Sequence, residues 1–258
     1  MKRRNFLGAS AAAGLAAAAE SQAAKPACFH LLYYYMRNGT QLERTTKYLG
    51  DTFLPAARRA GAGTAGFFSA VIAPASPFIL SLVSYPSLAA LETVQEKLAA
   101  DAPFQKGWDA YNTIGDPPYQ RMEGTLLRAF PGMPSIVAPP ADRQRAARIF
   151  ELRTYESTDE KASNRKRKMF EDGEAAIFRR LGMNPVFFGQ ATLLGRNLPN
   201  ITYMLAFDDL AAREKLWKDF GADAEWRKLR AQPGLSDAEI VSNISNAILR
   251  PLAFSEIR

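Results

Sequence analysis

Three polar residues that alternate along one segment of the chain are the first candidates for a binding site. In the segment IFELRTYE (residues 149–156), Glu151, Arg153 and Tyr155 occupy every second position. Because side chains of a β-strand point alternately to its two faces, the three share one face and the apolar residues between them share the other. Polar groups that converge in a hollow are the usual beginning of a ligand pocket. Glu151 and Arg153 can equally neutralise each other as an ion pair, and the two roles are compatible.

His30 is the only histidine in the chain, so an imidazole base, a haem ligand or a nucleophilic triad would have to use it. Its counterpart in the second half of the chain is Glu151, so the fold does not require an imidazole there and we expect a structural role. With one histidine and one cysteine (Cys28), the chain lacks the usual ligands of a zinc site and cannot form an internal disulfide. We expect no metal, haem or other cofactor.

Two further motifs resemble binding motifs, one for a dinucleotide and one for a nucleic acid, but the residues around them argue against both. Residues 61–66 spell G-x-G-x-x-G, but they end a predicted helix and open a strand, whereas a dinucleotide fingerprint follows a strand and opens a helix. Residues 164–168 (NRKRK) form the strongest basic run, which we interpret as a solvated helix face because no RNA-binding aromatic motif accompanies it. The sequence therefore predicts no nucleic-acid partner, although its formal net charge is +7.

The chain matches itself in order over most of its length. ADAPFQK (residues 100–106) corresponds to ADAEWRK (222–228), LAA (88–90) to LAA (210–212), and FHL (29–31) to FEL (150–152). Agreement of this kind indicates a tandem duplication. It also makes Phe104 and Trp226 equivalent, which favours packing for Trp226 in a core or at a barrel rim, with ligand stacking as the second role.

Both halves predict the same succession of elements. FHLLYYYM (residues 29–36) and IFELRTYE alternate as strands do, and each is followed by a helix, a β-hairpin, a second helical segment and a last strand. The order β-α-β-β-α-β is that of a ferredoxin-like unit. The predicted capping residues are Asn38, Asp159, Ser87 and Asp208 at helix starts and Gly61 and Gly182 at helix ends.

We therefore predict an α+β protein of two tandem ferredoxin-like domains, residues 28–131 and 147–258, joined by a Pro-rich linker at 132–146. A four-stranded sheet with both helices on one face leaves its other face uncovered. Two such sheets can bury each other, which favours a pseudo-dimeric barrel within one chain. Pairing between chains is the competing arrangement.

The first 24 residues predict an export signal rather than part of the fold. Arg3 and Arg4 precede Phe6-Leu7, a weakly apolar run to about Ala19 and small residues at a cleavage site, the pattern of a bacterial twin-arginine signal. An ordinary Sec signal is the alternative. The run falls short of the ~20 strongly apolar residues of a spanning helix, so we expect a periplasmic or secreted protein without a stable membrane anchor.

Several segments of the second half resemble the NIPSNAP family. They are FELRTYES (residues 150–157), FRRLGMNPVFF (178–188), TYMLAFDDLAAREKLWKDFGADAEWRK (202–228) and ILRP (248–251), and the first half looks like a diverged copy. The resemblance implies the dimeric α/β-barrel superfamily, in which two ferredoxin-like sheets pack face to face. It implies no agreed activity, since the wider superfamily includes cofactor-free monooxygenases and haem enzymes.

In such a barrel we expect the polar faces of the first strands to look inward. The residues concerned are Glu151, Arg153 and Tyr155 in the second half and His30, Leu32 and Tyr34 in the first. The apolar faces would then pack under the helices. Our candidate ligand-binding residues are Glu151, Arg153, Tyr155, Tyr34, His30 and Trp226.

Two classes of function are open to such a chain. The first, which we favour, is a module that binds a small molecule or assembles with other proteins, including copies of itself. The second is a cofactor-independent, monooxygenase-like enzyme with its site inside the barrel. Its candidate catalytic residues are Arg153, Tyr155, Tyr203 and Asn243. A cavity that these residues line and that opens to solvent would favour the enzyme.

Overall fold

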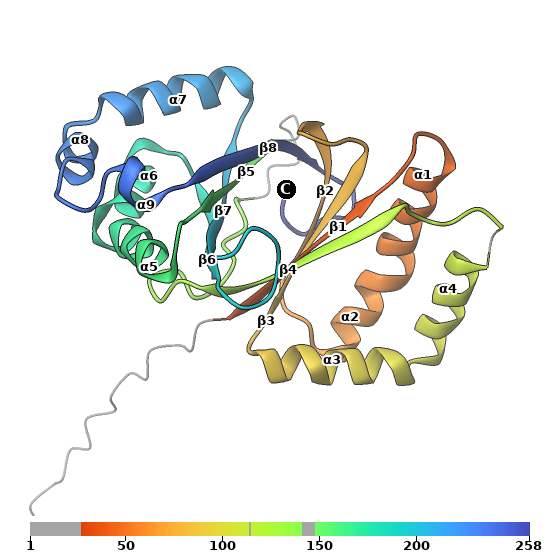
Figure 1. Ribbon diagram of the computed structural model, residues 1–258. Helices are drawn as coiled ribbons and strands as arrows, with labels where there is room; N and C mark the ends of the chain where they lie inside the picture. Colours follow the sequence, from red (N-terminus) through yellow and green to blue (C-terminus); the bar gives the residue numbers. More distant parts are fainter. Residues whose placement is uncertain (1–26, 114, 141–147) are drawn as a thin grey trace, which may run out of the picture.

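The computed structural model describes residues 27–113, 115–140 and 148–258, and Figure 1 shows their arrangement. The predicted signal peptide and part of the predicted linker lie outside these residues. The first half runs β1 (Cys28–Tyr35), α1 (Thr40–Lys47), the π-helical segment η1 (Tyr48–Phe53), α2 (Leu54–Ala60), β2 (Ala65–Ile72), β3 (Phe78–Tyr85), α3 (Leu88–Ala100), α4 (Ala102–Asn112) and β4 (Arg121–Ala129).

The second half repeats this order. It runs β5 (Ile149–Glu156), α5 (Glu160–Met169), η2 (Phe170–Glu174), α6 (Ala175–Leu181), β6 (Pro185–Ala191), β7 (Asn200–Phe207), α7 (Leu210–Ala222), α8 (Ala224–Arg230), the short α9 (Asp237–Ile240) and β8 (Asn243–Pro251). The helices of each half lie outside the strands, on opposite sides of the molecule (Figure 1).

Local sequence explains most helix boundaries. Ser87 and Asp159 accept hydrogen bonds from backbone N–H groups three residues on, and so begin α3 and α5 as expected. Gly61 (φ 102°) and Gly182 (φ 82°) end α2 and α6 in the left-handed conformation, which glycine adopts without strain.

Two predicted caps are wrong by one residue. Helix α1 begins after Gly39 and has no side-chain cap, so Asn38 does not cap it. Helix α7 is capped by Asp209, whose carboxylate accepts from the N–H of Ala212, while Asp208 lies 3.7 Å from Arg148. Asp208 and Asp209 are adjacent and chemically alike, so the sequence could not tell which of them caps α7.

In the described part of the chain, strands β1 to β8 form one closed antiparallel barrel in the order β1-β3-β2-β8-β5-β7-β6-β4. Each half contributes a sheet with the same internal order, β4-β1-β3-β2 and β8-β5-β7-β6. The halves join along β2–β8 and along β4–β6, the latter through Arg128 opposite Gln190 and Ala129 opposite Gly189. The expected barrel within one chain is confirmed, but the sheets join edge to edge, because closure satisfies strand edges that would otherwise be unpaired.

An apolar cluster with members from every strand fills the barrel interior. It includes Phe29, Leu31, Phe68, Leu80, Leu127, Phe150, Leu152, Phe187, Met204 and Leu249. Two other clusters lie between the barrel and the helices of each half. A barrel of this size has room for little besides its own side chains.

The predicted inward and outward faces are wrong in both halves. Phe150 and Leu152 point into the barrel, whereas Tyr155 belongs to the core beneath the second-half helices. Tyr34 likewise lies beneath the first-half helices, so Glu151, Arg153, His30 and Leu32 share the helix face by alternation. The apolar face of each first strand points into the barrel interior, which excludes water. The polar face lies under the helices, which supply its partners.

The end of the barrel where β2 and β6 begin is closed by two segments outside the strands. Ile257 is fully buried within the interior cluster, and Ile136 packs against the same cluster. The backbone N–H of Val137 donates to Val186, and that of Ala27 to Pro134. The described part of the predicted linker is therefore packed against the barrel.

We expect Ile257→Ala to lower the free energy of unfolding by about 2–5 kcal/mol, because it leaves a cavity at the closed end of the barrel. Urea denaturation measures the change. The matched control is Ile244→Ala on β8, where the side chain is 43% exposed, and it should stay within about 0.5 kcal/mol of wild type. Equal effects at the two positions would contradict the described closure.

Candidate functional site

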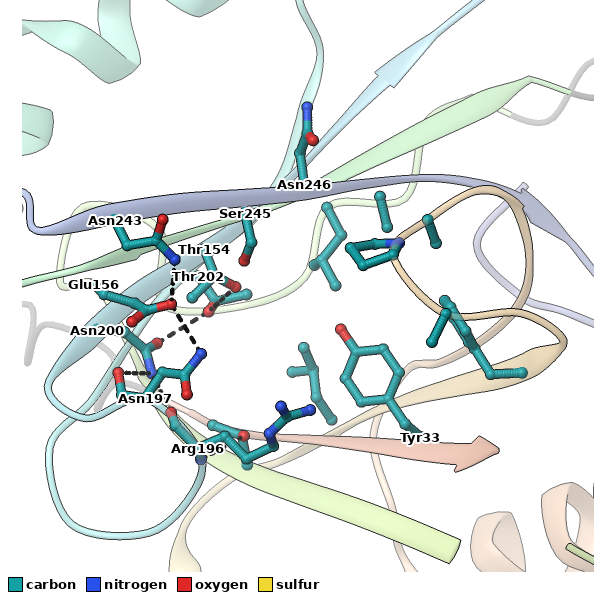
Figure 2. A pocket seen from close by; sticks show the side chains of 18 of the residues that line it. Tyr33, Thr154, Glu156, Arg196, Asn197, Asn200, Thr202, Asn243, Ser245 and Asn246 are labelled. Atoms are coloured by element: carbon teal, nitrogen blue, oxygen red, sulfur yellow. Dashed lines mark hydrogen bonds between the residues drawn. The ribbon is translucent and has the colours of Figure 1, made fainter. Parts of the chain in front are cut away.

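A cavity of about 290 Å³ opens at the end of the barrel where β1 and β5 finish (Figure 2). The β2–β3 turn (residues 73–75) and the β6–β7 turn (residues 196–197) lie at its edge. Its volume is near the lower end of the range for small-molecule sites. Its polar lining residues include Thr125, Thr154, Glu156, Asn197, Asn200, Thr202, Asn243 and Ser245, together with Arg121 and Arg196.

One wall of the cavity is aromatic. The rings of Tyr33 and Tyr35 stack with centroids 5.8 Å apart, and Phe78 meets them edge-on at 5.2 and 5.7 Å. The Arg121 guanidinium lies 4.0 Å from the centroid of the Tyr35 ring. Leu31 continues the apolar surface toward the barrel interior. This wall offers flat contact area to an apolar ligand.

A hydrogen-bonded polar wall faces Tyr33 across the cavity (Figure 2). The hydroxyls of Thr154 and Thr202 are 2.9 Å apart, and Thr202 donates to the side-chain carbonyl of Asn200 at 3.0 Å. Glu156 Oε1 accepts from the amides of Asn197 at 2.8 Å and Asn243 at 2.9 Å. These bonds fix the polar groups in place before any ligand arrives.

Two hydroxyls of the cavity lack a hydrogen-bond partner among the residues that the structure describes, those of Tyr33 and Ser245 (Figure 2). Burial raises the pKa of Tyr33 above its usual value, and the neighbouring Tyr35 adds to the effect. Tyr33 therefore presents a neutral hydroxyl that can donate or accept. Unpaired polar groups of this kind are the ones that a ligand can satisfy.

The two arginines at the cavity share one carboxylate. Glu123 accepts from Arg121 at 2.9 Å and also pairs with Arg196. Burial alone would raise the pKa of Glu123, but hydrogen bonds from Arg121 and Tyr35 and the charge of Arg196 hold it below its ordinary value. Both guanidinium groups therefore already pair with a carboxylate of the protein.

Among the candidate catalytic residues expected from the sequence, Asn243 lines this cavity and the other three do not. Tyr203 and Tyr155 belong to the core beneath the helices of the second half, where Tyr203 donates to the Tyr155 hydroxyl at 2.8 Å. Arg153 donates to the same hydroxyl at 3.3 Å and stacks over the Trp217 ring at 4.5 Å. These three residues form a packed network.

Glu151 is the centre of that network and is fully buried. Its carboxylate accepts from Arg153 at 2.9 Å, which confirms the predicted ion pair, and from Arg213 on α7 at 2.7 and 2.9 Å. Trp217 and Asn246 donate to it at 2.6 and 3.0 Å. Burial opposes the charge, but these donors hold the pKa of Glu151 below its ordinary value. The carboxylate thereby ties β5 to α7 and β8.

The remaining predicted ligand-binding residues also lie away from the cavity. Trp226 packs on Phe220 with ring centroids 4.5 Å apart beneath the second-half helices. Tyr34 meets Tyr119 edge-on at 5.9 Å beneath the first-half helices. His30 is on the same face of β1, where burial lowers its pKa.

The basic run at 164–168 differs from its prediction at one position. Lys166 is buried rather than solvated and pairs with the buried Glu174 at 3.1 Å. Burial opposes the charge of Lys166, but Glu174 keeps its pKa above the ordinary value. Since a helix turns its residues to all sides, one member of a basic run faces the core, and here η2 supplies its carboxylate.

Tyr33, Glu156, Thr154 and Ser245 were not among the site residues expected from the sequence. A signal for them exists along β5, whose interior face changes from apolar at Leu152 to polar at Thr154 and Glu156. When the interior face of a strand turns polar toward one end, it indicates that the barrel interior is open to solvent at that end. That signal is readable only once the interior face is known.

Comparisons with solved structures define the class of fold. A putative monooxygenase from Lactobacillus acidophilus NCFM has 10% sequence identity and a TM-score of 0.59, over 88% of this chain and 94% of that chain. One from Fusobacterium nucleatum subsp. nucleatum ATCC 25586 has 8% identity and a TM-score of 0.55, over 88% and 93%. An anthrone oxidase-like protein has 12% identity and a TM-score of 0.55, over 89% and 93%. Identities this low show a shared fold, an α+β barrel, and nothing more.

Within this class, residues 150–256 match the family model described as NIPSNAP. The chain therefore carries a NIPSNAP domain in its second half, as the resemblance predicted. No curated protein matches the chain.

Two other features concern metals and membranes. In residues 27–113, 115–140 and 148–258, no group of three or more His, Cys, Asp or Glu side chains is placed to hold a metal ion. No helix of these same residues has the length and apolar character needed to cross a membrane.

We expect Glu151→Gln to lower the free energy of unfolding by about 3 kcal/mol at neutral pH, because it leaves the partly buried Arg153 and Arg213 without their counter-charge. Glu151 has a lowered pKa, so its stabilisation is present above its ordinary pKa and is lost as the pH falls through the folded-state value. The difference between variant and wild type should shrink in acid. Chemical denaturation across pH 3–7 measures it.

The control for this prediction is Glu225→Gln, since the Glu225 side chain is 73% exposed beside Arg180. It should change stability little at any of these pH values. A difference between Glu151→Gln and wild type that stays constant into acid would contradict the assigned network.

Proposed function

We propose that this protein binds one small molecule in the mouth of its barrel. The observation that carries the proposal is the cavity itself, with an aromatic wall around Tyr33 and a fixed polar wall around Glu156. Concave sites with a mainly apolar surface and a few placed polar groups are where proteins bind small ligands. The rest of the interior is packed with side chains, which confines the ligand to this end.

We also propose that the halves are two copies of one ferredoxin-like unit, with domains at 28–131 and 147–258 and the first a diverged NIPSNAP domain. The shared order of elements and the equal strand order of the two sheets support this.

We propose, in addition, that the protein is exported through the twin-arginine route and that residues 1–24 are removed. Arg3-Arg4 and the weakly apolar run that follows them support this proposal.

Assembly into a homo-oligomer is supported by exposed leucines near the β4–β6 seam. Leu88, Leu193 and Leu194 line a hollow there and are 53%, 81% and 55% exposed. Apolar groups gathered in this way are typical of contact surfaces.

We expect a metabolite screen by thermal shift to reveal a ligand that Ser245→Leu no longer binds, since the larger side chain fills the cavity. A ligand at one hundred times its Kd stabilises by about 2.7 kcal/mol, which raises Tm by about 5–10 °C in a protein of this size. Ser242→Leu is the control, because Ser242 is exposed and does not line the cavity. A ligand bound equally by both variants would place the site elsewhere.

A cofactor-independent enzyme is the second candidate. It is favoured by the Glu156 carboxylate, which lies on the cavity wall and could accept a proton from a ligand, with Asn243 positioning it. Proteins of this fold include ones described as a putative monooxygenase and as anthrone oxidase-like. If the protein is a monooxygenase-like enzyme, the screened ligand should cause oxygen consumption at an oxygen electrode, and Glu156→Gln should abolish it. Ligand binding without oxygen uptake would contradict the monooxygenase-like enzyme and leave small-molecule binding as the function.

A further inference from the structure

The apolar half of the mouth cavity fits the body of a ring compound. Tyr33, Tyr35 and Phe78 form its wall, and Leu31 and Leu152 form the surface toward the barrel interior. None of these five residues brings a charge to the cavity. Rings gain contact area and favourable edge or face packing against such a wall.

The charges around the cavity disfavour a charged ligand of either sign. Arg121 and Arg196 both pair with Glu123, which leaves these three side chains with one net positive charge, and the carboxylate of Glu156 on the polar wall offsets it. A ligand charge of either sign would therefore find no net counter-charge in the mouth. Bringing an uncompensated charge into a partly buried site is unfavourable, and an uncharged ligand avoids this penalty.

The unpaired hydroxyls of Tyr33 and Ser245 set the polar requirement. They lie on different sides of the cavity, and no hydrogen bond to either is present within the described residues (Figure 2). A hydroxyl can both donate and accept, so these two match a ligand hydroxyl or carbonyl. Covering them with a purely apolar molecule would leave both without a partner, at a cost in affinity.

We propose that the ligand of the barrel mouth is an uncharged ring compound with at least one hydroxyl or carbonyl group, and that the hydroxyl of Tyr33 or of Ser245 binds each such oxygen. This inference rests on the proposed small-molecule site and specifies its ligand class. Because the charges of Arg121, Arg196, Glu123 and Glu156 cancel, charged analogues of the same shape should bind less tightly.

Three probes of equal ring size test the ligand class, namely 2-naphthol, 2-naphthoate and 2-naphthylmethylamine, which at pH 7 are neutral, anionic and cationic. Isothermal titration calorimetry should show 2-naphthol binding at least tenfold more tightly than either charged probe. 2-Naphthol carries one oxygen, so we expect one of the two substitutions Tyr33→Phe and Ser245→Ala, the one that removes its hydrogen-bond partner, to weaken binding about five- to tenfold, the loss of one neutral hydrogen bond. Both substitutions remove a hydroxyl without an intramolecular partner, so the fold is kept.

The matched control is Tyr34→Phe, which removes the next hydroxyl along β1 but on the helix face, and it should leave 2-naphthol binding unchanged. If a charged probe binds more tightly than 2-naphthol, the proposed ligand class is wrong, while the proposed small-molecule site in the barrel mouth is unaffected. Unchanged affinity in both Tyr33→Phe and Ser245→Ala would overturn the assigned recognition. If no naphthyl probe binds while the metabolite screen finds a ligand that Ser245→Leu excludes, this inference fails and the proposed function survives.

Discussion

The inner faces of the two β-sheets are apolar and have no helices to cover them, and the rest of the structure depends on burying them. Phe29 and Leu31 of the first half meet Phe150 and Leu152 of the second inside one closed barrel. Closure also pairs the outer strands of each half along β2–β8 and β4–β6. Because this packing fills the middle of the barrel, space for a ligand can remain only at an end that nothing closes.

The two ends of the barrel differ. Ile257 and Ile136 close the end where β2 and β6 begin. At the opposite end the interior-facing positions become polar, from Thr154 to Glu156 on β5, and a cavity remains. The site is therefore a consequence of where apolar side chains stop along the strands. Its polar groups are held by hydrogen bonds to one another, so the cavity is organised without a ligand.

The half that carries the NIPSNAP domain holds a buried charge network which the first half replaces with other packing. Glu151 receives five hydrogen bonds from Arg153, Arg213, Trp217 and Asn246, while its counterpart in the first half is His30. Removing one partner from a network this deep is strongly destabilising, because it leaves an uncompensated buried charge. The most conspicuous polar pattern of the sequence is thus structural, and the candidate site lies on the other face of the same strand.

Local sequence determined the succession of strands and helices, the duplicated order, most helix caps and the Glu151–Arg153 pair, because these depend on periodicity and on contacts between near neighbours in the chain. The tertiary structure decided which face of each strand points inward. Alternation separates two faces but cannot say which one lines the barrel interior and which one lies under the helices, since that depends on what covers each face. Helix α7 supplied partners for Glu151, and η2 supplied one for Lys166. Closure brought Tyr33 and Ser245, far apart in the chain, to the same cavity, and no local pattern encodes that meeting.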